Sequence, residues 1–218
     1  MKKAILFILF FCNVLIVFGQ TETTSKEFHY SFDEKKKQII YSGNNNYFTI
    51  KLKGKKVKLL DNEINQKPMN QNFLEIDGLV VGFSIIDIPN NNSSGLDSFN
   101  LSQSDQERIL KNYIEYELRY MQTQLNMKIN DLSIEMRDYK SKSYFLVNFK
   151  SDFNYNLSGS DSETITKQSK GQIYLCSIQF NKILVINVPF FEEEPTNEIL
   201  LFAKGFVKNI KSFNKKYN

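Results

Sequence analysis

Residues 173–190 read IYLCSIQFNKILVINVPF, which is two apolar runs joined by the polar pair Asn181-Lys182. Both runs have the length and the β-branched and aromatic content of strands, so this segment predicts a hairpin. In the second run, residues 183–190, apolar side chains occupy both alternating faces, which is typical of a strand covered on both sides. We therefore expect 183–190 to lie at the centre of a sheet.

Two amphipathic helices are expected to flank that sheet. The first begins at Ser104, where Glu107 three residues later forms a capping-box signature, and it runs to about Met127 with apolar residues at helical spacing. The second opens at the acidic and proline-containing run 192–195 and continues through about Phe213. Acidic residues and proline suit a helix start, because the free amide hydrogens and the positive end of the dipole lie there.

Alternating apolar and polar residues predict the remaining strands, and Asp77-Gly78 favours a tight hairpin turn between two of them. These strands are expected at 28–32, 38–41, 47–53, 57–60, 73–76, 79–88, 132–136 and 145–155. The order of strands, long helix, strands and closing helix predicts an α+β fold. Its sheet is mainly antiparallel and is flanked by the long central helix and the C-terminal helix.

The order of these elements resembles a known family. Tyr47-Phe48-Thr49-Ile50 opens a strand after a Gly/Asn turn, and a mid-chain helix, an antiparallel meander and an amphipathic C-terminal helix follow. Over roughly residues 40 to 213 this order is similar to that of the PsbP-like α/β/α sandwich. The resemblance implies an exported accessory or binding domain without its own catalysis, and it supplies no motif from which functional residues could be carried over.

The first 19 residues have the pattern of a signal peptide. Lys2 and Lys3 precede the apolar run 4–18, which is too short to cross a bilayer, and the small residue Gly19 follows. We predict cleavage after Gly19 and export to the periplasm or the extracellular space. An uncleaved anchor is the alternative interpretation.

Residues 20–27 are polar and predict a flexible tether, and residues 28–218 are expected to form a single α+β domain. Loss of the two leader lysines lowers the formal net charge by two from +4, so no nucleic-acid partner is expected. No later segment is apolar enough to span a membrane after processing. Cys176 is then the one remaining cysteine, so an internal disulfide is not expected.

The sequence argues against most catalytic and metal chemistry. His29 is the one histidine and is expected to be structural or exposed, while Cys176 is interpreted as a buried thiol. These two residues give too few ligands for zinc. The oxygen-rich loop 158–163 could hold calcium but lacks the residue order of a dedicated calcium loop, and we interpret it as a solvated turn. No metal, cofactor or catalytic residue is predicted.

Two exposed lysines are the candidate contact residues. Lys51 and Lys53 fall on the outward face of a strand, where they could meet an anionic partner or blunt the strand edge against aggregation. The leading hypothesis is an exported, non-catalytic binding or accessory domain with an unknown protein or envelope ligand. One alternative is a hydrolase that uses a pair of its 24 acidic residues, and another is a carrier of a small apolar ligand between sheet and helix.

Overall fold

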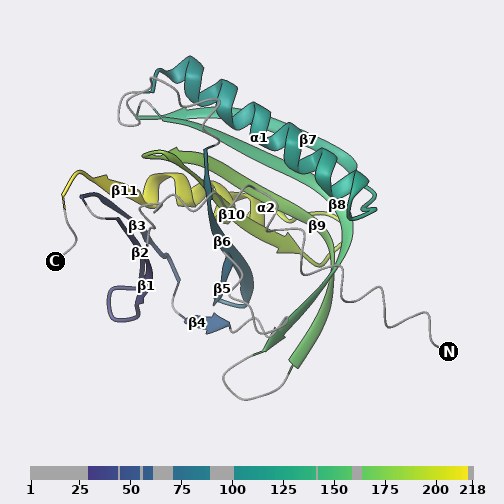
Figure 1. Cartoon of the computed structure of the whole chain (residues 1–218). Coiled ribbons are helices and arrows are strands. Elements are labelled where there is room, and N and C mark those ends of the chain that lie inside the picture. Colours follow the sequence, from purple (N-terminus) through teal and green to yellow (C-terminus); the bar gives the residue numbers. More distant parts are fainter. Residues whose placement is uncertain are drawn as a thin grey trace, which may run out of the picture.

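The computed structural model describes residues 29–43, 45–54, 56–60, 71–88, 101–140, 142–158 and 164–215 (Figure 1). The predicted signal peptide and tether, and residues 159–163 of the loop considered for calcium, lie outside the described residues. In chain order the elements are β1 (His29–Asp33), β2 (Gln38–Ser42), β3 (Tyr47–Lys51), β4 (Val57–Leu60), β5 (Gln71–Ile76), β6 (Leu79–Asp87), α1 (Gln103–Thr123), β7 (Asn130–Tyr139), β8 (Lys142–Ser158), β9 (Thr164–Gln179), β10 (Lys182–Phe190), α2 (Asn197–Gly205), the 3-10 helix η3 (Phe206–Asn209) and β11 (Ile210–Phe213).

The strands form two antiparallel sheets, which confirms the α+β class. The larger sheet has seven strands in the order β4-β5-β6-β10-β9-β8-β7, and the smaller has four in the order β1-β2-β3-β11. Strand β10 pairs with β6 on one side and β9 on the other, and all of its residues are buried. The expectation of a central, doubly covered strand is therefore confirmed. The turn at Asp77-Gly78 is also confirmed, with φ angles of 50° and 89° at its two residues.

Alternate residues of β10 divide the core into two layers. Ile183 and Val185 face α1 and belong to the cluster that holds its Ile114. Leu184 and Ile186 face the opposite way, into a cluster shared by the smaller sheet, α2 and η3. The two-residue period of the strand thus places α1 on one face of the larger sheet and the remaining elements on the other (Figure 1).

The first helix begins and ends earlier than the sequence indicated. Its N-cap is Ser102, whose hydroxyl accepts a hydrogen bond from the Asp105 amide at 3.1 Å, so the predicted cap Ser104 lies inside the first turn. The helix ends at Thr123 and not near Met127, and Asn126, at φ 51°, has a conformation that cannot continue it. The stripe of apolar residues that faces the sheet is nevertheless as expected.

The predicted continuation of the second helix to Phe213 is wrong. Helix α2 ends at Gly205, η3 follows, and β11 then pairs antiparallel with β3 to close the smaller sheet. The ring of Phe213 stacks on that of Tyr47 at 4.5 Å between centroids. This tertiary pairing overrides the helical spacing of the apolar residues, which holds only as far as the end of η3.

The acidic run before α2 lies outside the helix, contrary to the interpretation from sequence. The N-cap is Thr196, whose hydroxyl accepts from the Ile199 amide. Glu194 instead forms an ion pair with Lys150 of β8, and Glu193 lies 3.9 Å from the Lys170 ammonium of β9. The run therefore connects the segment before α2 to two neighbouring strands.

Strand β9 has a glycine where the packing leaves no room for a side chain. A Cβ atom on Gly171 would lie 2.0 Å from Cζ of Phe190 and 2.5 Å from the carbonyl oxygen of Phe149. A ring from one strand thus packs directly over the backbone of its neighbour, a close approach that glycine alone allows. The pairing of β8 with β9 shifts register just beyond this point, between Lys150 and Phe153.

Candidate functional site

A pocket of about 270 Å³ opens where the start of β8, the end of β9, β11 and the beginning of α1 meet. Its lining combines polar and apolar side chains, as is common in sites for small ligands. The lining residues are Leu101, Gln106, Lys142, Ile178, Phe180, Ser212 and Asn214.

Lys142, the first residue of β8, supplies the positive charge of this pocket. Its ammonium donates hydrogen bonds to Oε1 of Gln179 at 2.7 Å and to Oγ of Ser212 at 2.9 Å. Both acceptors are neutral, and no carboxylate among the described residues forms an ion pair with it. Burial accordingly lowers the pKa of Lys142 below its usual value.

The groups around Lys142 are held in place by further hydrogen bonds. Gln179 is fully buried, and its Oε1 also accepts from the Ser212 hydroxyl at 2.8 Å while its Nε2 donates to Ser177 at 3.1 Å. Gln106 of α1 accepts from the Ser143 amide at 3.2 Å and thereby ties the helix to β8 beside Lys142. The polar side of the pocket is therefore built before any ligand binds.

Phe180 forms part of the apolar side from an unusual backbone conformation. It is the first residue of the two-residue turn between β9 and β10, has φ 57°, and is 9% exposed. A bulky residue in this left-handed region costs roughly 1 to 2 kcal/mol relative to glycine, which hairpin turns of this kind favour.

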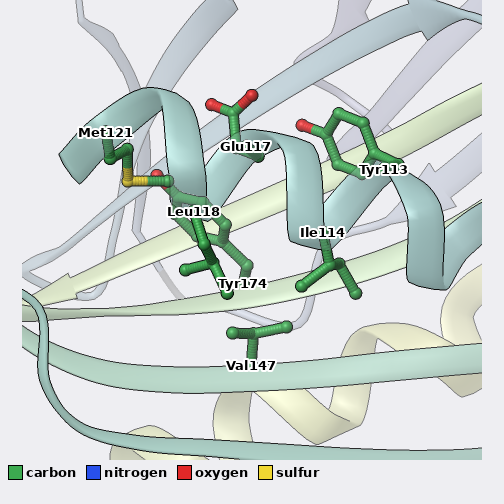
Figure 2. Close-up of a pocket in the computed structure, with 7 residues that line it drawn as sticks. All are labelled: Tyr113, Ile114, Glu117, Leu118, Met121, Val147 and Tyr174. Carbon is green, nitrogen blue, oxygen red and sulfur yellow. The ribbon is translucent and has the colours of Figure 1, made fainter. Parts of the chain in front are cut away.

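A second depression lies between α1 and the larger sheet, and it has no room for a ligand. Figure 2 shows Ile114 and Leu118 directed toward Val147, with Glu117 and Tyr113 on the flank of the helix. The free volume among these side chains is about 0 Å³. This part of the core therefore offers no support for the predicted carrier of an apolar ligand.

Glu117 is a half-buried carboxyl group in that depression. Burial raises the pKa of Glu117 above its usual value. Burial also raises the pKa of Tyr113 well above its usual value, and the nearby Glu117 carboxylate raises it further. The pKa of the Cys176 thiol is raised for the same two reasons, burial first. A half-buried carboxyl group and an unreactive thiol without a cleft do not form a catalytic site.

The other residues singled out from the sequence lie apart from the pocket. Lys51 and Lys53 are both exposed, but β3 ends at Lys51, so Lys53 lies beyond the strand and not on its outward face as expected. Ser212 of the pocket pairs with Phe48 near the other end of β3. His29 is exposed on β1 of the smaller sheet, and Cys176 is buried beneath α1. The predicted buried thiol is thus confirmed.

Two broader features of the described residues bear on the excluded chemistries. They contain no group of three or more His, Cys, Asp or Glu side chains that could hold a metal ion. None of the helices in this part of the chain is long and apolar enough to cross a membrane. Sequence reasoning missed Lys142, because its partners come from distant segments.

Fold and pocket together define a two-sheet α+β domain with a small half-polar pocket. Among solved structures the chain is similar to the solution structure of cyanobacterial PsbP (CyanoP) from Synechocystis sp. PCC 6803, with 12% identity and a TM-score of 0.40 over 89% of this chain and 96% of that one. No protein-family model and no curated protein matches the chain. The expected resemblance is thus confirmed as a weak likeness of fold, and no activity or residue role is taken from it.

Proposed function

We propose that this chain is an exported, non-catalytic binding domain whose pocket at Lys142 holds a small carboxylate with a short apolar tail. The observation that carries the proposal is the half-buried Lys142 ammonium, which hydrogen-bonds to two neutral groups at the wall of a pocket of about 270 Å³. Burying a charge without an opposite charge beside it is unfavourable. An anionic ligand would form a charge-assisted hydrogen bond with the Lys142 ammonium and so offset this cost.

The rest of the lining favours a ligand with an apolar part. Leu101, Ile178 and Phe180 face the pocket together with the Lys142 side chain. The volume is just below the range of about 300 to 1,000 Å³ typical of pockets for drug-sized molecules, which favours a short chain. A carboxylate on such a chain would place its charge at Lys142 and its methylene groups against the apolar residues.

Export and a single domain remain part of the proposal. The basic start, the short apolar run and Gly19 support a signal peptide at residues 1–19. The cluster that joins the smaller sheet to the larger one supports one domain over residues 28–218. The mature protein is expected to begin at Gln20, and the intact mass of the exported form would test this.

The alternative of a hydrolase with two carboxylates has no supporting arrangement among the described residues. Glu117 is the described carboxyl group whose pKa burial raises, and the titratable groups that it affects are Tyr113, Tyr120 and Cys176, none of which is a second carboxyl group. Asp131 and Glu194 do approach each other, but both bind the Lys150 ammonium between them, in an exposed position. Neither arrangement provides a proton-donating acid opposite a base.

Titration calorimetry of the purified protein with hexanoate and with hexan-1-ol tests the proposal. Hexanoate is expected to bind more tightly than the alcohol of equal chain length, because only the acid carries a charge for Lys142. Lys142→Met keeps most of the side-chain volume but removes the ammonium, and it should weaken hexanoate binding at least about tenfold, the loss expected for a hydrogen bond to a charged group.

Two further variants make the result specific. Lys140→Met removes an exposed charge two residues away and should leave hexanoate affinity unchanged. Phe180→Gly should weaken hexanoate more than acetate, because it removes part of the apolar wall. Equal binding of acid and alcohol, or equal affinity of the Lys142 and Lys140 variants, would show that the pocket does not select an anion.

A further inference from the structure

Strand β7 lies at one edge of the larger sheet (Figure 1). It carries an exposed apolar row. Leu132, Ile134 and Met136 alternate along it and are 46%, 45% and 48% exposed. Ile134 pairs with Val147 of β8 and Met136 with Phe145, and both partners belong to the core beneath α1. The row therefore lies on the same face of the sheet as the core beneath α1 and extends it to the edge strand, where the side chains are exposed to solvent.

The opposite face of β7 carries two opposite charges. Arg137 donates to the Glu135 carboxylate at 2.7 Å, and Lys204 of α2 lies 3.7 Å from the same carboxylate. Arg137 is exposed, and its guanidinium has donors to spare for a second carboxylate. Along the strand, the negative Glu135 is therefore followed two residues later by the positive Arg137.

A bulge sets the limits of the segment that can pair further. The register of β7 against β8 shifts between Asn130 and Ser133, and Asp131 has φ 50°. Bulges and charges protect edge strands against indiscriminate pairing, and this bulge disrupts the ladder before Ser133. The regular part of the edge is 133–139, and its centre is Met136.

We propose that a second copy of this chain adds its β7 to this edge, antiparallel about a two-fold axis at Met136. In that register Met136 lies opposite the partner's Met136, and Ile134 lies diagonal to it on the same face. On the other face Glu135 lies opposite the partner's Arg137, and Arg137 lies opposite the partner's Glu135. The edge is thus complementary to itself in charge, and apolar side chains meet at its centre.

Neighbouring registers lack this complementarity. Centring the pair on Glu135 sets that carboxylate against the partner's Glu135, and centring it on Ile134 requires the irregular residue Asp131 to pair. Asp138, which would lie opposite the partner's Ile134, already accepts from Gln103 and Ser143 of its own chain. A pairing about Met136 therefore leaves no new carboxylate without a donor.

The two-fold axis would run perpendicular to the sheet, so both copies of α1 lie on the same face. The two apolar rows then form one strip between the helices, and the larger sheets join into one continuous sheet. The pocket at Lys142 takes no part in this contact, so the dimer and the anion site are independent properties.

Cysteine cross-linking of the purified protein tests the register directly. Met136→Cys should form a disulfide-linked dimer under mild oxidation, because directly opposite side chains have Cβ atoms about 4.5 to 5.5 Å apart, and an approach of about 1 Å brings them to the separation found in disulfides. Leu132→Cys is the matched control, since its side chain is equally exposed on the same face but lies outside the paired segment. The native Cys176 is buried and should not react.

Sedimentation equilibrium measures the contact without a cross-link. The unmodified protein should be a reversible dimer, Arg137→Glu should make it monomeric by setting like charges opposite each other, and Arg108→Glu on α1 should leave it dimeric. A monomer at all concentrations, or equal cross-linking at residues 132 and 136, would overturn the proposal. A monomer that binds phosphatidylglycerol vesicles through Ile134 would overturn it in favour of a membrane surface.

Discussion

Replacing Phe206 by alanine tests how the C-terminal segment is held in the fold. The side chain is 3% exposed at the start of η3, in the cluster shared by the two sheets. Its ring makes edge contacts with Phe83 of β6, at 5.7 Å between centroids, and with Phe202 of α2, at 5.1 Å. The substitution therefore removes contacts to both the larger sheet and the preceding helix.

The expected loss follows from these contacts. Burial of a phenylalanine side chain stabilises a fold by about 1.5 to 3 kcal/mol, and each edge contact between rings adds about 0.5 to 1.5 kcal/mol. Since the surroundings relax only partly around a cavity, Phe206→Ala should cost about 3 to 5 kcal/mol. Domains are stable by about 5 to 15 kcal/mol, so this loss is a large fraction of the total.

Urea unfolding followed by circular dichroism measures the change in the free energy of unfolding. Lys208→Ala is the matched control, because Lys208 lies in the same 3-10 helix but is exposed, and its loss should stay within about 0.5 kcal/mol. The dependence of the free energy on urea should be the same in all three proteins. Equal, mild losses in the two variants would refute the packing of η3 on the sheet.

Three further predictions concern other parts of the fold. Gly171→Ala should lose at least about 2 kcal/mol of stability in urea unfolding, because its Cβ has no space, whereas Gly205→Ala, with nothing within 4 Å of its Cβ, should gain about 0.5 to 1 kcal/mol. Because the pKa of Glu117 is raised in the folded protein, stability should fall as pH rises from its usual value of 4.5. Glu117→Gln should therefore be more stable than the unmodified protein at neutral pH, and thermal melts should show that this difference disappears in acid. Replacing Lys51 and Lys53 by glutamine should lower the salt needed for elution from heparin, and unchanged elution would leave them as solvated edge residues.

The parts of the fold that could be predicted depend on local patterns. The apolar run 183–190 shows its central position in its own composition, since a strand covered on both faces needs apolar residues at successive positions. Asp77-Gly78 determines its turn because both residues accept positive φ. The stripe on α1 follows from helical spacing alone. None of these features requires knowledge of a distant segment.

The parts that failed depend on distant partners. The apolar residues of 210–213 have a spacing that is compatible with a helix. In the structure this segment instead pairs with β3, a distant strand, so the local spacing predicted the wrong element. The pocket was missed for the same reason. Lys142 meets Gln179 and Ser212, which are 37 and 70 residues away, and a segment taken for helix gave no reason to look for Ser212 there. The sequence likewise did not separate the strands into two sheets.

The pairing of β11 with β3 has a consequence for how the chain is made. Strand β11 completes a sheet whose other three strands lie far before it in the sequence. During synthesis the edge of β3 remains unpaired until residues 210–213 have left the ribosome. Pairing across such a long stretch of chain is slow, because closing the loop costs conformational entropy before any stabilising contact between the strands forms. The β3 edge therefore stays unpaired while all the residues between β3 and β11 are synthesised.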